Sequence, residues 1–187
     1  NHGTINGATW SNDVPNNTPT DISLSSSSVA ENESSGATVG TLSTTDADAG
    51  DSHTYTLVSG SGDTHNSSFN ISGSNLQTAA SFDFESQSSY NIRIETEDSG
   101  GLTYEEAITI TITDVNEVPT DISLSSESVD ENESSGTTVG ALSSTDVDAG
   151  DSHTYTLISG SGSTHNSSFT ISGSNLQTAA SFNFESQ

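Results

Sequence analysis

Oxygen-bearing side chains gather at one joint of the sequence, residues 114–120, where one sequence unit ends and a near copy of it begins. Asp114, Asn116 and Glu117 follow one another there. Ca²⁺ takes six to eight oxygen ligands from carboxylates, side-chain amides and backbone carbonyls, so this composition favours a calcium site. Further acidic residues join such a site if the chain folds them back to the joint: Glu31, Asp83 with Glu85, and Asp146 with Asp148.

Other chemistries fit these residues less well. Residues 46–51 resemble the start of an EF-hand loop, but Leu57 stands where that loop needs a glutamate, and no helix pattern flanks it. No Gly-x-Ser-x-Gly elbow is present. A glycosidase carboxylate pair fails because the best carboxylates belong to a metal pattern that duplicates with the unit. We therefore predict no enzymatic activity. A surface or strand-edge role is also favoured over a zinc site for the histidines that recur beside turns, His53, His65, His153 and His165.

The charge of the chain restricts its partners. Lys and Arg together number 1 against 26 acidic residues, a net charge of -25. Nucleic acid and anionic membrane surfaces are repelled by such a chain, whereas cations are attracted. The chain has no Cys, so disulfide bonds cannot stabilise its small domains. Bound metal is then the candidate that would stabilise them. No apolar run approaches the length of about 18 residues that a membrane span needs, so no membrane insertion is predicted.

The sequence repeats with a period of 100 residues. Residues 18–87 and 118–187 are identical at 59 of 70 positions. A fixed period of this size indicates whole domains in series. We predict a lead-in segment at 1–17, a first domain at 18–117 and a second at 118–187. The lead-in is expected to form one strand around residues 8–10, with Trp10 plugging the end of the first core or, alternatively, stacking on a sugar.

Within each unit, short segments of alternating apolar residues are separated by Gly, Asn, Asp and Ser. This pattern predicts an all-β fold, a β-sandwich of about seven strands, with no helix. The apolar residues that define the strands of the first unit are Ile22 and Leu24, residues 39–42, Tyr55 and Leu57, Phe69 and Ile71, Leu76, Ile92 and Ile94, and Ile108, Ile110 and Ile112.

Five motifs occur in order over residues 18–120, and together they resemble a cadherin repeat of the bacterial cadherin-like kind. The motifs are Ala30-Glu31-Asn32 for Pro-Glu-Asn, Asp46-Ala47-Asp48 for Asp-x-Asp, Phe82-Asp83-Phe84-Glu85 for Leu-Asp-Arg-Glu, Asp98-Ser99-Gly100 for Asp-x-Gly, and Asp114-Val115-Asn116-Glu117 for Asp-x-Asn-Asp. The sequence departs from the family at Glu117, where the linker aspartate is replaced by a longer carboxylate, and at Val118, where the family often has Asn.

The resemblance implies tandem Greek-key sandwiches with up to three Ca²⁺ ions between successive domains. Two ions would be held by Glu31, Asp83, Glu85, Asp114, Glu117 and Asp148, and the third by Asn116, Asp146 and Asp148. At the start of the first domain, Val14 and Asn17 replace the acidic linker residues while Asn16 is kept. A single ion is therefore expected there, with Asn16, Asp46, Asp48 and Asp98 as ligands.

We predict a non-enzymatic module that acts as a structural or adhesive segment of a larger extracellular surface or filament protein, with joints that stiffen when Ca²⁺ binds. Its expected partners are calcium ions and neighbouring repeats or other copies of itself. The alternative is a carbohydrate-binding module attached to a polysaccharide-degrading system. That reading needs an exposed aromatic platform, whereas most of the aromatic residues stand at expected core positions: Tyr55, Phe69, Phe82, Phe84 and Tyr90.

The second unit stops at Gln187, before counterparts of residues 90–97 and 104–113. We therefore expect a truncated second domain that lacks its last two strands. A sandwich without them would expose an apolar face, which monomers do not tolerate well. The expectation is that the natural chain continues or that strands of another copy complete the domain.

Overall fold

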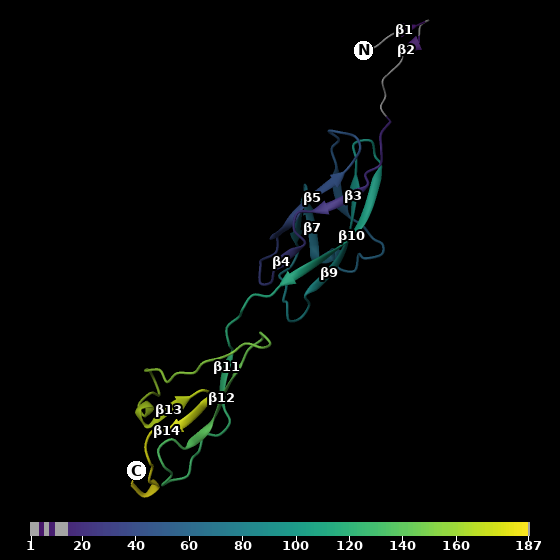
Figure 1. The fold of residues 1–187 in the computed structure, drawn as a ribbon. Coiled ribbons are helices and arrows are strands. Elements are labelled where there is room, and N and C mark those ends of the chain that lie inside the picture. Colours follow the sequence, from purple (N-terminus) through teal and green to yellow (C-terminus); the bar gives the residue numbers. More distant parts are fainter. Residues whose placement is uncertain (1–3, 6–7, 10–14, 187) are drawn as a thin grey trace. The chain divides into compact units, whose positions relative to one another are not determined.

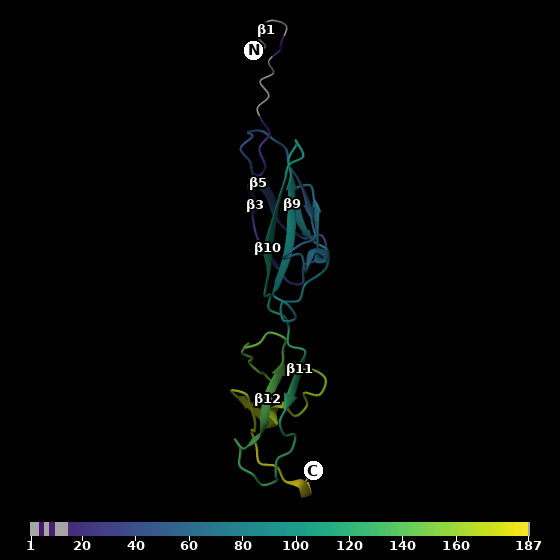
Figure 2. The ribbon, with the colours of Figure 1, turned by 90° about the vertical axis from the view of Figure 1, so that its right-hand side faces the viewer.

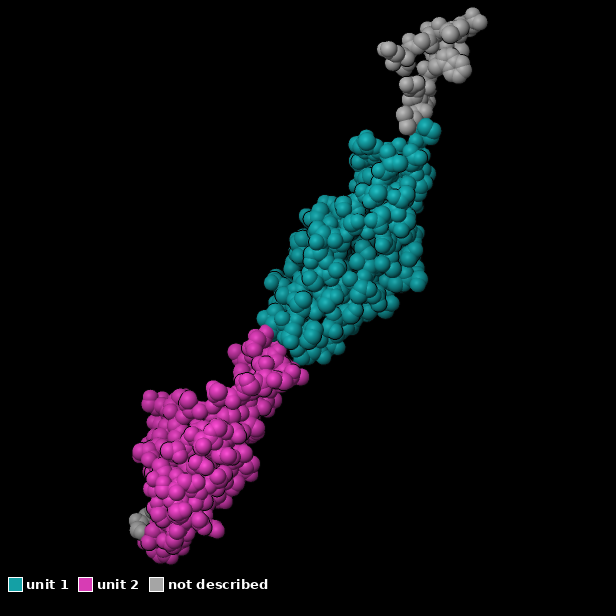
Figure 3. Space-filling view, viewed as in Figure 1, with its two compact units in different colours: residues 1–115 teal, residues 116–187 magenta. Residues whose placement is uncertain are grey.

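The structure is a computed structural model that describes residues 4–5, 8–9 and 15–186. The chain divides into two compact units, Asn1–Val115 and Asn116–Gln187 (Figure 3). Each unit is built from β-strands, and the helical elements within the described residues are 3-10 turns of three residues. No helix in this part of the chain is long and apolar enough to span a membrane.

The lead-in contains β1 (Thr4–Ile5) and β2 (Ala8–Thr9), which pair antiparallel. The strand expected around residues 8–10 is thus present at Ala8–Thr9, and it has a partner that the sequence pattern did not predict. Trp10 lies outside the described residues.

The first unit is a sandwich of two four-stranded sheets (Figure 1). One sheet has the order β3-β5-β8-β7 and the other the order β4-β10-β9-β6. The strands are β3 (Asp21–Leu24), β4 (Ser28–Ala30), β5 (Thr38–Thr45), β6 (Thr54–Leu57), β7 (Phe69–Ser72), β8 (Asn75–Thr78), β9 (Ser89–Glu97) and β10 (Thr103–Thr113), with the turn η1 (Asn66–Ser68) before β7. Eight strands form instead of the predicted seven, because the first apolar segment is followed by β4, which joins the opposite sheet.

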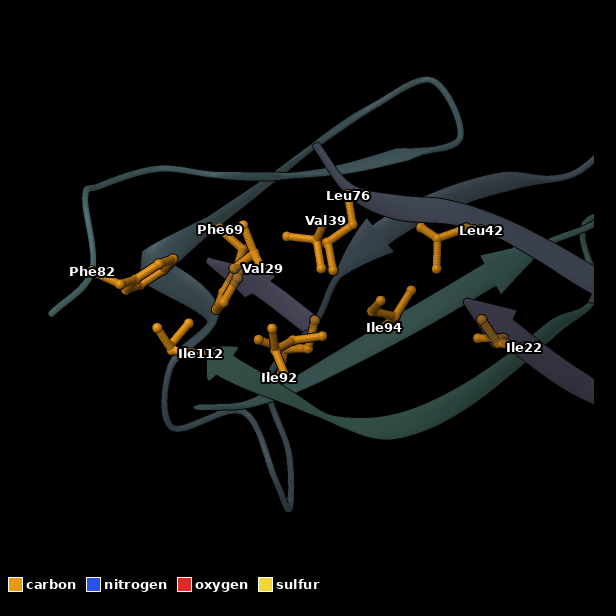
Figure 4. Close-up of a cluster of buried hydrophobic side chains, with 11 residues drawn as sticks. Ile22, Val29, Val39, Leu42, Phe69, Leu76, Phe82, Ile92, Ile94 and Ile112 are labelled. Atoms are coloured by element: carbon orange, nitrogen blue, oxygen red, sulfur yellow. The ribbon is translucent and has the colours of Figure 1, made fainter. Parts of the chain in front are cut away.

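The two long strands β9 and β10 complete the core of this unit. They pair antiparallel over nine residue pairs, from Thr103↔Glu97 to Thr111↔Ser89, and lie side by side in Figures 1 and 2. Their inward residues Ile92, Ile94, Ile110 and Ile112 are fully buried. Figure 4 shows residues of both sheets meeting in one cluster. Burial of each such side chain contributes about 1.5–3 kcal/mol, so this strand pair supplies much of the stability of the unit.

The second unit contains a single four-stranded sheet of order β11-β12-β14-β13. Its strands are β11 (Asp121–Leu124), β12 (Thr138–Thr145), β13 (Phe169–Ser172) and β14 (Asn175–Thr178), with the turns η2 (Asn166–Ser168) and η3 (Phe184–Ser186). They match β3, β5, β7 and β8 of the first unit in position and pairing.

Residues 128–130 and 154–157 form no strand, although their counterparts are β4 and β6. The prediction that the second domain lacks only its last two strands therefore underestimated the number of strands that do not form. The physical reason is visible in the first unit, where β4 pairs only with β10 and β6 only with β9. A strand forms when a neighbouring strand satisfies its backbone hydrogen bonds.

Candidate metal sites

Three carboxylates converge where the first unit begins. Asp46, Asp51 and Asp98 each offer a carboxylate oxygen, and these oxygens lie within 4.8 Å of one another. Asp46 and Asp51 come from the loop between β5 and β6, while Asp98 follows β9 directly. A hollow of about 490 Å³, lined by Asn16 and residues 47–51, adjoins the group.

Local hydrogen bonds fix the shape of this group. The side chain of Asn16 donates to Asp98 at 2.9 Å, and the backbone amides of Gly100 and Leu102 donate to the other oxygen of Asp98 at 2.8 Å each. A side chain on Gly100 would collide with the amide of Asn16 and displace it from Asp98. Asp48 instead accepts two hydrogen bonds from Asn17, one from the backbone at 2.6 Å and one from the side chain at 3.0 Å.

Asp98 is held in its ionised form. Burial raises its pKa, but the hydrogen bonds from the backbone of Leu102, the side chain of Asn16 and the glycine amides outweigh burial, so the pKa of Asp98 lies below its ordinary value. The carboxylate is 6% exposed. Among the described residues, no Lys or Arg side chain balances this buried negative charge, because the single Arg93 pairs with Glu105 at 2.8 Å.

Asp51 is a candidate ligand that sequence reasoning missed. Ser99 donates a hydrogen bond to its Oδ1, whereas its Oδ2 is buried and accepts no hydrogen bond within the described residues. A buried carboxylate oxygen without a donor is costly unless a cation binds it. The signal available in the sequence was the recurrence of this aspartate as Asp151 in the second unit.

The other end of the first unit holds a second set of predicted ligands. Glu31 is only 3% exposed and accepts hydrogen bonds from the backbone amides of Phe84 at 2.8 Å and Val115 at 2.9 Å. One carboxylate therefore ties the segment of Asp83 and Glu85 to the segment that follows Asp114. Asp83 accepts from the backbone and the hydroxyl of Ser86, both at 3.0 Å. Asp83, Glu85 and Asp114 are exposed.

The second unit begins with an acidic group that parallels the first. The carboxylate oxygens of Asp146, Asp148 and Asp151 lie within 4.8 Å of one another. Asp148 accepts a hydrogen bond from the backbone amide of Glu117 at 2.7 Å, and its Oδ1 accepts none within the described residues. The side chain of Asn116 donates to the carbonyl of Glu117 at 2.8 Å.

His153 contacts this second group. Its Nε2 lies 2.9 Å from Asp146 Oδ2, whereas the equivalent distance in the first unit, from His53 Nε2 to Asp46 Oδ2, is 3.3 Å. The hydrogen bond from His153 lowers the pKa of Asp146 below its ordinary value, in spite of partial burial, which raises it. Both units therefore present clustered carboxylate oxygens in the equivalent loops 46–51 and 146–151, which suits a hard cation such as Ca²⁺.

Comparison with known proteins agrees with this architecture. Residues 25–113 match the family model of the cadherin domain. Among solved structures, the human desmocollin-1 ectodomain has a TM-score of 0.63 at 24% identity, covering 90% of this chain and 35% of that chain. Human protocadherin-24 EC1-2 has a TM-score of 0.62 at 16% identity, covering 92% and 82%. The protocadherin GammaB4 extracellular domain has a TM-score of 0.57 at 25% identity, covering 90% and 28%.

The fold and the acidic loops define a tandem β-sandwich repeat protein. The first unit is a cadherin domain, as the five sequence motifs predicted. The chain spans between 28% and 44% of the length of the first four protocadherin ectodomains that it matches.

Proposed function

We propose that this chain is a calcium-binding, non-enzymatic segment of an extracellular adhesion protein. The observation that supports the proposal most directly is the convergence of Asp46, Asp51 and Asp98, with one buried oxygen of Asp51 left without a hydrogen bond. The match of residues 25–113 to the cadherin domain supports the extracellular, adhesive setting.

The donor set at the first unit fits Ca²⁺ by its chemistry. It offers carboxylate oxygens from three aspartates and the side-chain amide of Asn16 beside them. Within the described residues, the converging group includes no imidazole or thiolate that would favour a softer metal, since His53 is not among its members and the chain has no Cys. Asp48 would become a further ligand of this ion once its two hydrogen bonds from Asn17 are broken. The ion would supply the positive charge that the buried carboxylates lack.

A larger site is proposed at the joint. The family pattern assigns Glu31, Asp83, Glu85 and Asp114 to one side and Asn116, Glu117, Asp146 and Asp148 to the other. Each side already holds its residues in order through backbone hydrogen bonds, to Glu31 in the first unit and to Asp148 in the second. Ions shared by the two sides would link the units, and their removal would leave like charges to repel one another.

Calcium would stabilise the folded chain by mass action. Extracellular calcium modules have dissociation constants of roughly 10⁻⁴ to 10⁻³ M. Millimolar Ca²⁺ would then contribute on the order of 1 kcal/mol per site to the free energy of unfolding. Several sites together would make the chain much less stable after chelation.

Isothermal titration calorimetry of the full chain tests the metal assignment. Asp51→Asn should remove the single site of the first unit, while Asp114→Asn should weaken binding at the joint and leave the first site intact. Asp21→Asn is the matched control, because this carboxylate lies on β3, outside both groups. Unchanged titrations for Asp51→Asn and Asp114→Asn would refute the assignment.

Adhesion is tested separately from metal binding. Beads coated with the chain should cluster in millimolar Ca²⁺ and disperse on addition of a chelator if other copies are the partner. The polysaccharide alternative gains no support from the aromatic side chains of the first unit, because Phe69 and Phe82 are buried in the core and Tyr55 and Tyr90 pack against it. Binding to polysaccharide with no bead clustering would reverse this preference.

A further inference from the structure

The segments that lead into the strands of the two units differ at a residue that touches the acidic loop. Asn17 stands at this place in the first unit, and Glu117 stands at the equivalent place in the second. Each lies beside an aspartate of the loop that follows, Asp48 in the first unit and Asp148 in the second. The repeat therefore compares an amide and a carboxylate at one position.

The backbone contact of this residue is nearly the same in both units. The amide nitrogen of Asn17 donates to Asp48 Oδ2 at 2.6 Å. The amide nitrogen of Glu117 donates to Asp148 Oδ2 at 2.7 Å. The contrast between the units therefore lies in what the two side chains do.

The side chain of Asn17 binds the other oxygen of its aspartate. Its Nδ2 donates to Asp48 Oδ1 at 3.0 Å and to the carbonyl of Pro15 at 3.2 Å. Both hydrogens of the amide nitrogen are thereby used, so the amide is oriented with its donor toward the carboxylate. Both oxygens of Asp48 accept hydrogen bonds from one residue, and these bonds stabilise its negative charge without a cation.

Glu117 cannot make this second contact, because an ionised carboxylate has no hydrogen to donate. Asp148 is only 7% exposed, and its buried Oδ1 accepts no hydrogen bond within the described residues. A buried carboxylate oxygen in this state is costly unless a cation binds it. The same loop position thus calls for a cation in the second unit and is already satisfied in the first.

The convergence of the carboxylates follows the same division. Asp148 is a member of the group of the second unit whose oxygens lie within 4.8 Å of one another. Its counterpart Asp48 is not a member of the converging group in the described part of the first unit. The other two loop aspartates converge in both units: Asp46 and Asp51 in the first, Asp146 and Asp151 in the second.

We propose that the residue at this position sets how strongly each acidic loop depends on Ca²⁺. Asn17 forms an amide clasp, which we define as its two hydrogen bonds to Asp48, and the clasp competes with a cation for that carboxylate. Glu117 leaves Asp148 available to a cation. This inference rests on the proposed calcium binding and adds the residue that tunes it.

Competition gives the clasp a measurable sign. An ion that recruits Asp48 must first break charge-assisted hydrogen bonds, which are the stronger kind in proteins. Loop 46–51 should therefore respond at a higher Ca²⁺ concentration than loop 146–151. In chelator the clasp should keep loop 46–51 the better ordered of the two.

Hydrogen exchange of the full 187-residue chain across a Ca²⁺ titration measures each loop, because Ala47 and Val147 give their peptides different masses. Asn17→Ala removes the side-chain half of the clasp. Loop 46–51 should then exchange faster in chelator, and its Ca²⁺ midpoint should fall about 10-fold, as expected for the loss of one competing hydrogen bond to a charged group. A midpoint that stays unchanged or rises would overturn the proposal.

The reciprocal variant tests whether the clasp can be transferred. In chelator, loop 146–151 should exchange more slowly in Glu117→Asn than in Glu117→Ala, because both remove the same charge and only asparagine supplies a donor to Asp148. Equal exchange in these two variants would also overturn the clasp. Thr18→Val is the control and should affect neither loop, since the second unit already has valine at the equivalent position.

The outcomes separate the clasp from calcium binding itself. If Ca²⁺ slows exchange in both loops of the unmodified chain and Asn17→Ala does not lower the midpoint, the clasp is wrong and calcium binding stands. Extracellular calcium modules are saturated at about 10 mM Ca²⁺. If neither loop responds at that concentration, the proposed function is wrong and the clasp is overturned with it.

Discussion

The two units share 59 of 70 aligned residues, yet they bury them differently. Phe69 is 2% exposed and Leu76 fully buried, whereas Phe169 and Leu176 are only half-buried. The strands that contain these residues have the same bounds and the same register in both units. The difference shows that one sheet forms from its own residues, while the burial of its apolar face depends on β9 and β10.

The largest expected effect comes from truncating the same core residue in each unit. Phe69→Ala should lower the free energy of unfolding of the first unit by about 3–5 kcal/mol, the usual cost of a large cavity in a packed core. Phe169→Ala should cost the second unit clearly less, because the ring is already in contact with solvent. Chemical denaturation followed by segment-resolved hydrogen exchange measures each unit separately.

Thr170→Asn is the control for this pair, since it changes an exposed residue on the same strand as Phe169. An equal loss of stability for Phe69→Ala and Phe169→Ala would contradict the view that β9 and β10 make the difference between the units.

A smaller effect should be the same in both units, because the geometry is the same. A Cβ on Gly40 would lie 2.5 Å from the carbonyl oxygen of Ser26, and on Gly140 it would lie 2.6 Å from that of Ser126. Gly40→Ala and Gly140→Ala should therefore each cost about 1–3 kcal/mol through forced backbone shifts. The measurement is the denaturation midpoint of each unit, with Thr41→Ala as control because the second unit already has Ala141. A neutral Gly40→Ala would show that the loop at Ser26 yields easily.

The sequence pattern predicted strands that have one face in the core. It could not show whether each of these segments has a neighbouring strand to pair with. Alternating apolar residues located β5, β7, β8, β9 and β10, because each has one face in the core. Segment 154–157 has the same alternation as β6 and remains irregular, since a strand also needs an edge to pair with. Local pattern cannot report whether that edge exists.

The candidate sites divide in the same manner. Asp46 and Asp98 were found from motif residues that flank turns, and the structure brings them together. Asp51 was missed because its environment is created by Ser99, which lies 48 positions away along the chain. Asp48 was expected beside Asn16 and instead contacts Asn17, since an amide side chain occupies the place of Glu117. The sequence therefore predicted some of the side chains that converge, whereas their orientation required the fold.

Acid should weaken both units, by different routes. Asp98 and Asp146 have pKa values below the ordinary range, so the native chain binds fewer protons than the unfolded chain near pH 4. The stability that these carboxylates contribute is present above about pH 4 and is lost as the pH falls through their lowered pKa values. Melting temperatures measured in chelator between about pH 2 and 6 should show this decline.

Single variants separate the two routes. Asn16→Ala removes a donor to Asp98 and should make the acid dependence of the first unit shallower, and His153→Gln should do so for the second unit alone. The control is Asn75→Ala, on the exposed surface of β8. An acid dependence that neither variant changes would mean that other carboxylates dominate the acid response.

The smallest effect concerns Arg93, the one cationic Lys or Arg side chain of the sequence. Its Nε donates to Glu105 at 2.8 Å and its Nη1 to the carbonyl of Ser61 at 3.1 Å, while Glu105 stands directly opposite Glu95 in the β9–β10 register. Both side chains of the ion pair are partly exposed, at 23% and 40%, so the pair is worth only about 0–1 kcal/mol.

Arg93→Gln should therefore cost the first unit less than about 1 kcal/mol, with part of the cost due to repulsion between the two glutamates. Because that repulsion is screened by salt, the cost should shrink between about 0.01 M and 1 M NaCl. Arg93→Lys is the comparison, since it keeps the charge and loses the planar donor group. A cost that does not change with salt would show that the contact with Ser61, which holds the loop of Gly60 and Gly62 in place, matters more than the charge.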